Sequence, residues 1–161
     1  MELRILAIGD VTGQGGVDML CRHMSALRRK YGIDFAVVNG ENADTIGARP
    51  QQIEQLFYAG ADVVTLGNHT FGKKDLIPMI EDDERLLRPS NYSRYAPGSG
   101  WGIYDVNGVS IMVISLIGRV FMDVGPENPF LEADRILKNR SADITLIDFH
   151  AEATSEKLAL A

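Results

Sequence analysis

Short apolar runs alternate with helical patterns along the first half of the chain. Three of these runs predict buried strands, at 3–8, 35–38 and 62–66. Each is followed by a stretch that predicts a helix, at 17–31, from Pro50 to just before Gly60, and from Lys73 to about Ile80. Successive strand–loop–helix units favour a parallel sheet with right-handed crossovers, so the expected fold class is α/β.

Residues that punctuate the pattern mark the helix ends. Gly32 follows the basic residues 28–30, which complement the negative end of a helix dipole, and glycine can adopt the left-handed conformation that closes a helix. Later in the chain, Asn128 and Pro129 predict a cap and a first-turn proline for a helix that ends near Asn139.

The pattern changes after Pro89. Two apolar segments, 101–106 and 109–114, flank Asn107-Gly108, which is a strong signal for a two-residue hairpin turn. An antiparallel pair is therefore expected to join the sheet system, and residues 144–149 predict one more buried strand. The chain contains no internal repeat, low-complexity tract or linker, which indicates a single domain over 1–161.

Composition narrows the class of protein. With 161 residues, 45% of them hydrophobic, 24% charged and a net charge of −6, the chain is typical of one soluble globular domain. The acidity argues against broad nucleic-acid coating but permits a small phosphorylated substrate. A single cysteine, Cys21, excludes an internal disulfide and a thiolate metal cluster. No stretch reaches the length of a membrane span and no leader pattern is present, so we expect a cytoplasmic protein without membrane partners.

Polar side chains collect where the predicted strands end. Because the carboxyl ends of such strands meet at one edge of a sheet, the following residues are expected to converge: Asp10, Glu41, Asn42, Asn68, His69 and His150. Carboxylate, amide and imidazole donors favour magnesium, manganese, iron or zinc. Two such ions about 3.5–4 Å apart, bridged by one carboxylate, would clamp a phosphate and activate a bridging water.

Taken singly, these residues have ordinary structural explanations. Asp10 is equally well explained as the cap of the following helix. Glu41 and Asn42 suit solvated loops, Asn68 suits a turn, and a single histidine is more often structural than catalytic. The joint interpretation is favoured because glycines that permit close approach of a ligand crowd the same loops, namely Gly9, Gly13, Gly40, Gly67 and Gly72.

Other chemistries fit less well. The stretch 13–16 could cradle a dinucleotide phosphate, with Glu41 as the ribose-binding acid, but it lacks the full G-x-G-x-x-G register. A serine-hydrolase elbow is absent from the sequence. His23 is interpreted as a solvated helix residue, and Cys21 as a small residue that faces the core.

Four short motifs together resemble a known family. They are Gly9-Asp10, Gly40-Glu41-Asn42, Gly67-Asn68-His69 and the segment 149–153. In order and spacing they resemble the calcineurin-like metallophosphoesterases, and more narrowly the bacterial branch described as 2′,3′-cyclic-nucleotide phosphodiesterases. The resemblance implies an αββα sandwich of two mixed sheets flanked by helices, with a dinuclear centre that usually holds iron or manganese.

The resemblance also implies individual roles. Asp10 would bind the first metal, Glu41 would bridge the two ions, and Asn68 and His150 would bind the second. His69 matches the histidine that stands free of the metals and protonates the leaving group. Further polar residues are expected around these: Asn42 in or beside the ligand shell, Thr12 on the substrate's sugar side, and Glu152 as a carboxylate that orients an imidazole.

The chain departs from the family pattern at its end. The family continues for about a hundred residues and supplies two more metal histidines from a Gly-Thr-His-Thr-His segment, which this sequence does not contain. We therefore expect an incomplete N-terminal portion that lacks the C-terminal strands and leaves an apolar edge open to self-association. The alternative to a phosphodiesterase is a catalytically incomplete regulatory protein that binds metal or nucleotide and is linked to RNA-processing proteins.

Overall fold

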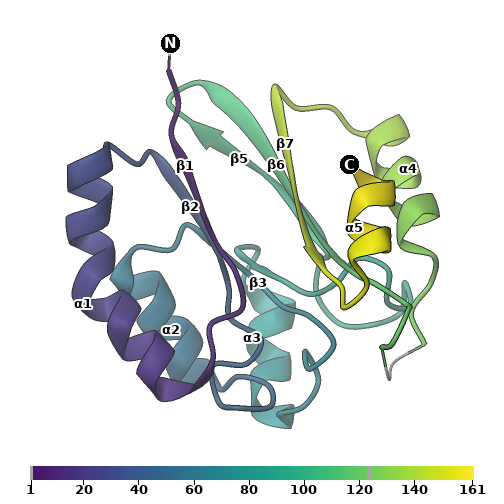
Figure 1. Cartoon of the computed structure of the whole chain (residues 1–161), viewed down its shortest axis with the longest axis horizontal. Helices are drawn as coiled ribbons and strands as arrows, with labels where there is room; N and C mark the ends of the chain where they lie inside the picture. The colour runs from purple at the N-terminus through teal and green to yellow at the C-terminus, as the bar shows by residue number, and fades with distance from the viewer. Residues whose placement is uncertain (1, 123–124) are drawn as a thin grey trace.

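The computed structural model describes residues 2–122 and 125–161. Two β-sheets lie face to face, and helices cover their outer surfaces (Figure 1). Helices α1 (Gly13–Tyr31) and α2 (Pro50–Ala59) pack on one side, while α4 (Pro129–Asn139) and α5 (Thr154–Leu160) lie on the other. This layering agrees with the expected sandwich.

The first sheet is built from the repeated strand–helix units. Its strands run parallel in the order β1 (Ile5–Ile8), β2 (Phe35–Asn39), β3 (Val63–Thr65) and β4 (Leu86–Leu87). The 3₁₀ turn η1 (Lys74–Leu76) and helix α3 (Ile77–Asp82) connect β3 to β4. The predicted parallel units are confirmed, but the expectation of two mixed sheets is wrong for this one, which is parallel throughout the described residues.

The second sheet is mixed. The hairpin of β5 (Trp101–Val106) and β6 (Val109–Ile117) is antiparallel, and β7 (Ile144–His150) pairs parallel to β6. The predicted hairpin turn is confirmed, because Asn107 and Gly108 have φ angles of 56° and 83°. The hairpin forms a separate sheet and does not extend the first one, and β7 lies at its edge within the described residues.

Helix ends mostly follow the predicted signals. Gly32 is left-handed with φ 61° and closes α1, and the Asn128 side chain accepts the Phe130 N–H at 2.9 Å to cap α4. The predicted start of α1 is too late, because Gly13 already opens the helix. Glycine suits this first turn, since a Cβ on Gly16 would stand 3.0 Å from Val11 Cγ1. The prediction for Cys21 is wrong, because its side chain is exposed.

Strand alternation divides the apolar residues between three layers. Residues such as Ala36, Val38 and Val64 pack under α1 and α2. Met112, Ile114 and Leu116 pack under α4. Between the sheets lies a layer that we call the inter-sheet layer, made of Phe35, Val37, Val63, Leu87, Ile111 and Val113 with the partly buried Ile144 and Leu146.

The inter-sheet layer becomes polar where the strands end. Continuing the same alternation, Asn39 follows Val37, Thr65 follows Val63, and Asp148 follows Leu146. Asn39 and Thr65 are neighbours in the β2–β3 register. The polar end of this layer underlies the loops that carry the predicted site residues. None of the helices in the described part of the chain is long and apolar enough to cross a membrane.

Candidate active site

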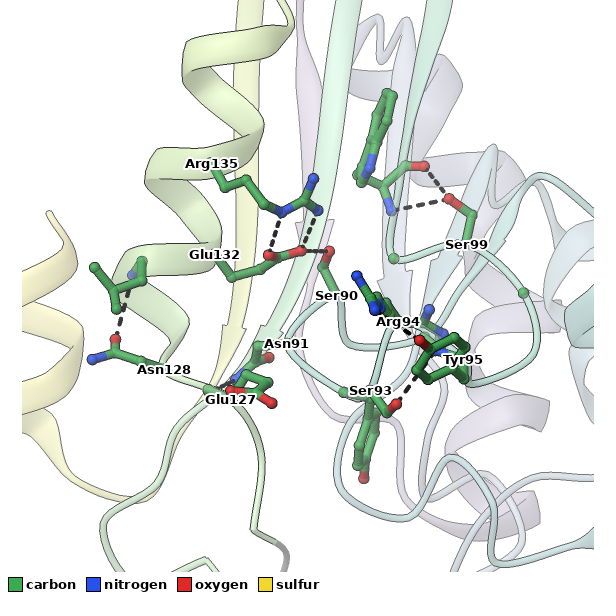
Figure 2. A pocket seen from close by; sticks show the side chains of 16 residues that line it. Ser90, Asn91, Ser93, Arg94, Tyr95, Ser99, Glu127, Asn128, Glu132 and Arg135 are labelled. Carbon is green, nitrogen blue, oxygen red and sulfur yellow. Dashed lines mark hydrogen bonds and ion pairs between the residues drawn. The ribbon is translucent and has the colours of Figure 1, made fainter.

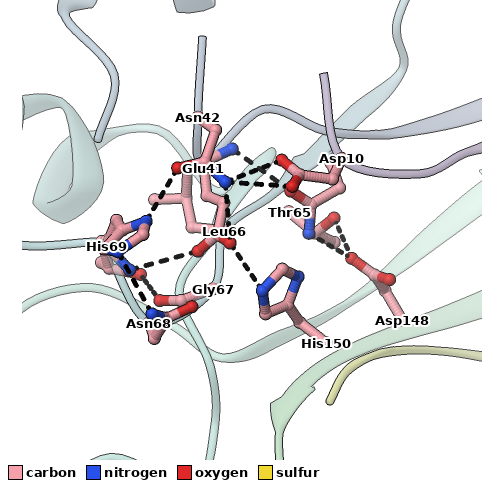
Figure 3. A network of polar contacts seen from close by, with 12 residues as sticks. Asp10, Glu41, Asn42, Thr65, Leu66, Gly67, Asn68, His69, Asp148 and His150 are labelled. Carbon is pink, nitrogen blue, oxygen red and sulfur yellow. Dashed lines mark hydrogen bonds and ion pairs between the residues drawn. The ribbon is translucent and has the colours of Figure 1, made fainter. Parts of the chain in front are cut away.

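The predicted residues meet at the carboxyl ends of the strands (Figure 3). Asp10 follows β1, Glu41 and Asn42 follow β2, Asn68 and His69 follow β3, and His150 is the last residue of β7. Hydrogen bonds connect all of these side chains into one network. The two sheets therefore contribute to a single polar cluster, as the strand-end argument requires.

Glu41 lies at the centre of the cluster. Its side chain is fully buried, at 0% exposure, which rejects the interpretation as a solvated loop residue. Oε1 lies 2.7 Å from His150 Nε2, and Oε2 accepts the His69 backbone N–H at 3.1 Å. A Cβ on Gly67 would overlap the Glu41 carboxylate, so only glycine leaves the space that this group occupies.

Asn42 joins the acidic and imidazole groups. Its Nδ2 donates to both oxygens of Asp10, each at 3.0 Å, and lies 3.4 Å from Glu41 Oε1. Its Oδ1 lies 2.7 Å from His69 Nδ1. Asp10 is thus held by Asn42, whereas the N-cap of α1 is Thr12, so the interpretation of Asp10 as a helix cap is wrong.

The hydrogen bonds of His69 define its tautomer. Asn42 Oδ1 can only accept, so Nδ1 of His69 donates to it. Asn68 Nδ2 donates, at 3.3 Å, to Nε2 on the other side of the ring. With the two amides oriented in this way, Nδ1 is the donor nitrogen of the His69 ring and Nε2 is the acceptor.

His150 lies among carboxylates. Its hydrogen bond with Glu41 raises the pKa of the imidazole, burial opposes that shift, and the negative charges of Glu41, Asp10 and Asp148 raise it further. Within the described residues, no lysine or arginine forms an ion pair with these three carboxylates. Gathering carboxylates without a cationic side chain is unfavourable unless a cation or a proton compensates their charge.

The donor set suits a divalent cation. Within the described ranges, no three His, Cys, Asp or Glu side chains lie close enough to hold a metal by themselves. The arrangement instead combines carboxylates of Asp10 and Glu41 with the amide of Asn68 and the imidazole of His150, a mixture typical of hard and borderline metals. The residues present therefore fit a metal that takes amide oxygens as well as carboxylates.

Two predicted residues lie outside this network. Thr12 is exposed at the N-cap of α1 and its side chain makes no capping hydrogen bond. Glu152 is also exposed, and the carboxylate that contacts the His150 ring is that of Glu41. Their roles at the substrate and at the imidazole stay predictions.

Sequence reasoning assigned no role to several residues that support the cluster. Asp148 accepts hydrogen bonds from Asn39 and Thr65, and the Tyr92 hydroxyl donates to the Asn68 carbonyl at 3.1 Å. A signal for Asp148, Asn39 and Thr65 is present in the sequence: each is a polar residue two positions after an apolar strand residue, and therefore on the same face of the strand.

A cavity of about 710 Å³ lies away from this cluster (Figure 2). It is bounded by the segment 88–101 and by the start of α4, and it contains none of the predicted site residues. Glu132 crosses it and is held by Ser90 and by Arg135, whose Nε donates at 2.7 Å. Its polar groups are thus largely paired with each other, and the candidate chemistry stays with the cluster around Glu41.

Comparisons with known proteins agree with the sequence motifs. The model of the YmdB-like protein family matches residues 6–161. The 2′,3′-cyclic-nucleotide 2′-phosphodiesterase of Bacillus subtilis (strain 168) is 42% identical over 161 residues, which cover 98% of this chain and 61% of the relative.

Solved structures show the same relationship. A Thermus thermophilus protein superposes with a TM-score of 0.91 at 39% identity, over 99% of this chain and 62% of that one. A phosphatase of Mycoplasma pneumoniae gives a TM-score of 0.89 at 32% identity, over 98% and 58%. The chain spans about three-fifths of the length of these relatives.

Two facing sheets, flanking helices and an acidic, amide and imidazole cluster at one edge are consistent with a metallophosphoesterase-like fold. Within that class, the chain belongs to the YmdB-like family. The family resemblance predicted from the four motifs is confirmed.

Proposed function

We propose that the chain carries a metal-dependent phosphodiesterase site that acts on 2′,3′-cyclic nucleotides or similar small phosphodiesters. The observation that carries the proposal is the buried Glu41 carboxylate, which contacts Asn42 beside it and groups from two other strand ends without a lysine or arginine partner among the described residues. The names of the Bacillus subtilis and Mycoplasma pneumoniae relatives support the same reaction class.

The proposed metal ligands are Asp10, Glu41, Asn68 and His150, with Glu41 shared between two divalent ions, iron or manganese. When bound, such ions polarise phosphate oxygens and lower the pKa of a coordinated water. Asn42 orients Asp10 and keeps it beside Glu41. An amide ligand such as Asn68 adds an oxygen without adding negative charge, so the site retains its attraction for phosphate.

His69 is the proposed proton donor to the leaving oxygen. Its backbone N–H is fixed by Glu41 and its Nδ1 by Asn42, so the ring has little freedom to rotate. Nε2 is the atom that accepts a proton and then delivers it, because Nδ1 is already committed to Asn42. Asn68 Nδ2 can donate to this atom only while Nε2 is unprotonated, because both ring nitrogens of a protonated imidazole are donors.

Hydrolysis of 2′,3′-cyclic AMP and of an aryl phosphodiester, with manganese added, tests this proposal. We expect the wild-type chain to hydrolyse at least one of them in a chelator-sensitive reaction, and Asp10→Asn and His69→Ala to lose most of the rate. His23→Ala is the matched control, because His23 is exposed on α1. Equal rates in all four proteins, or rates that ignore the chelator, would contradict the proposal.

A calorimetric titration with manganese separates the enzyme from the binding-protein alternative. Two tight equivalents together with hydrolysis support the phosphodiesterase. One weak equivalent without hydrolysis would instead support a regulatory protein that binds metal or nucleotide. A link to RNA-processing proteins, self-association at the β7 edge and cytoplasmic location stay predictions.

A further inference from the structure

A partly buried polar contact connects the two sheets beneath the cluster. Asp148 Oδ2, on β7, accepts the Asn39 Nδ2–H at 2.9 Å and also accepts the Thr65 hydroxyl. The two donors belong to the other sheet, on β2 and β3, and are 2% and 0% exposed. Figure 3 shows Asp148 and Thr65 beside the cluster, at the point where the inter-sheet layer changes from apolar to polar.

The same contact leads on to Glu41. Asn39 uses its Oδ1 to accept the Glu41 backbone N–H at 3.2 Å, while its Nδ2 is held by Asp148. On the other side, Asp148 precedes His150 by two residues on β7, so both side chains lie on the same face of that strand. One carboxylate is therefore connected to the backbone of both partners in the Glu41–His150 contact.

Loss of the Asp148 acceptor is costly for the buried residues that donate hydrogen bonds to it. Asn39 and Thr65 are too buried for water to replace Asp148 easily. The Thr65 hydroxyl can also donate to the Val38 carbonyl, at 3.5 Å, whereas Asp148 is the acceptor of the Asn39 amide in the described structure, and a buried donor without an acceptor is costly. In the described residues every buried side-chain donor and acceptor has a partner. The hydrogen bonds to Asp148 therefore favour the relative position of the sheets that brings Glu41 Oε1 to 2.7 Å from His150 Nε2.

The strand offers an internal comparison. Asp143, immediately before β7, accepts the Ser110 N–H at 2.8 Å and the Ser110 hydroxyl at 2.6 Å. Its carboxylate also joins the start of β7 to another strand through two hydrogen bonds, but Asp143 is exposed and lies at the opposite end of β7. Asp143 can therefore stabilise the sheet without influencing the cluster.

We propose that Asp148 is a positioning residue that holds Glu41 against His150 by fixing the carboxyl ends of the two sheets through Asn39 and Thr65. An effect of Asp148 on catalysis depends on the proposed function, whereas its effect on the geometry of the cluster does not. Asp148 itself contacts neither of these two side chains through a hydrogen bond in the described structure, so it acts through Asn39 and through its own strand.

The test compares the whole chain with Asp148→Ala, Asp148→Asn, Thr65→Val and the control Asp143→Ala. In metal-free protein, amide hydrogen exchange at the Glu41 and His69 N–H groups reports the geometry of the cluster. We expect Asp148→Ala to accelerate exchange at both, Asp148→Asn to restore most of the protection because its amide oxygen can still accept, and Asp143→Ala to leave both rates unchanged. Thr65→Val retains the shape of the side chain and covers the case in which Asp148→Ala fails to fold.

Manganese affinity is the second readout. We expect Asp148→Ala, or Thr65→Val in its place, to bind manganese about 10–100-fold more weakly, as is usual when a group that supports metal ligands is lost. Asp143→Ala should bind as the wild type does, even if its melting temperature falls equally. Unchanged exchange at Glu41, or affinities that fall equally in the two alanine variants, would overturn the positioning role. If the wild-type chain bound no manganese, the proposed function would fail, while the exchange rates would still decide the role of Asp148.

Discussion

The two ends of the inter-sheet layer differ in chemistry although they belong to the same strands. At the amino end, Phe35, Val63 and Ile111 pack against each other without polar partners. At the carboxyl end, the same alternation places Asn39, Thr65 and Asp148, which form hydrogen bonds with one another and with the Glu41 and Val38 backbones. The strands therefore supply stability at one end and a candidate reactive cluster at the other.

The difference indicates how each end responds to substitution. Apolar contacts at the amino end are non-directional, so a lost methyl group lowers the free energy of unfolding without changing distant geometry. The hydrogen bonds at the carboxyl end are directional, so a lost partner changes which atoms face each other. Substitutions at the amino end of the inter-sheet layer should therefore lower stability, whereas substitutions at its carboxyl end should lower activity.

The largest expected effect is on activity, in Glu41→Gln. The amide keeps the volume of the side chain but removes the charge that faces His150 and the proposed metals. We expect kcat/KM to fall about 10³-fold, which corresponds to several kcal/mol of lost transition-state stabilisation. Steady-state hydrolysis of the aryl phosphodiester measures this change, and a rate within about threefold of the wild type would show that Glu41 is not part of the reactive site.

A substitution at the apolar amino end of the inter-sheet layer should lower stability and leave activity nearly unchanged. Ile111 is fully buried in the inter-sheet layer, and Ile111→Ala is expected to cost about 3 kcal/mol of unfolding free energy because it leaves a cavity. The kcat of the folded fraction should stay close to that of the wild type. Urea denaturation followed by assays below the unfolding transition checks both parts. A specific loss of kcat at unchanged stability would remove the distinction between the two halves.

Gly67→Ala probes the space reserved for the Glu41 carboxylate. The added methyl group would overlap that carboxylate, which must move away from His150 and His69. We expect such a displacement to lower kcat/KM about 10²-fold. The control is Gly108→Ala at the hairpin turn, where a Cβ meets no atom within 4 Å and only the positive φ is strained. Equal activity in both variants would argue that the room beside Glu41 is unimportant.

The smallest expected effect concerns Tyr92 at the rim of the cluster. Tyr92→Phe removes a hydrogen bond to the Asn68 carbonyl and should lower the free energy of unfolding by about 1 kcal/mol at neutral pH. Burial, assisted by the negative charge of Glu41, raises the pKa of Tyr92 to about 12. Because the unfolded phenol ionises near pH 10, this stabilisation is complete below about pH 10 and is lost as the pH rises through 12.

Because the pKa of Tyr92 is raised, the difference in stability between the wild type and Tyr92→Phe should depend on pH. Between about pH 9.5 and 11.5 the wild type should lose stability that the phenylalanine variant does not lose, so the gap between their unfolding free energies should narrow. Chemical denaturation at a series of pH values measures this gap. A gap that widens with pH would mean that the phenol is not held in its neutral form by the fold.

The sequence predicts the local elements and the strand-end residues because both are governed by short-range patterns. The apolar run at 35–38, the Asn107-Gly108 turn and the Asn128 cap are each determined by residues close together in the sequence. Asp10, Glu41 and His150 could be chosen because strand ends in parallel sheets converge. Strand β4, with only Leu86–Leu87, leaves too short a pattern to detect.

Features that depend on contacts between the sheets could not be predicted. Asp148 accepts from residues that precede it by 109 and 83 positions, and no local pattern reports such a pairing. The complete burial of Glu41 and the need for glycine at position 67 likewise arise only when separate loops are assembled. The early start of α1 at Gly13 reflects packing of the glycine turn on Val11, which overrides the poor helix propensity of glycine.

The central claim is that the cluster around Glu41 binds metal ions. The most direct test is a crystal structure of the wild-type chain grown with manganese, with the ions located by anomalous scattering. We predict anomalous peaks within coordination distance of Glu41, one of them shared with Asp10 or His150, and their loss in Glu41→Gln crystals. Peaks confined to surface carboxylates such as Asp75 or Asp134, or the absence of any peak beside Glu41, would contradict the account.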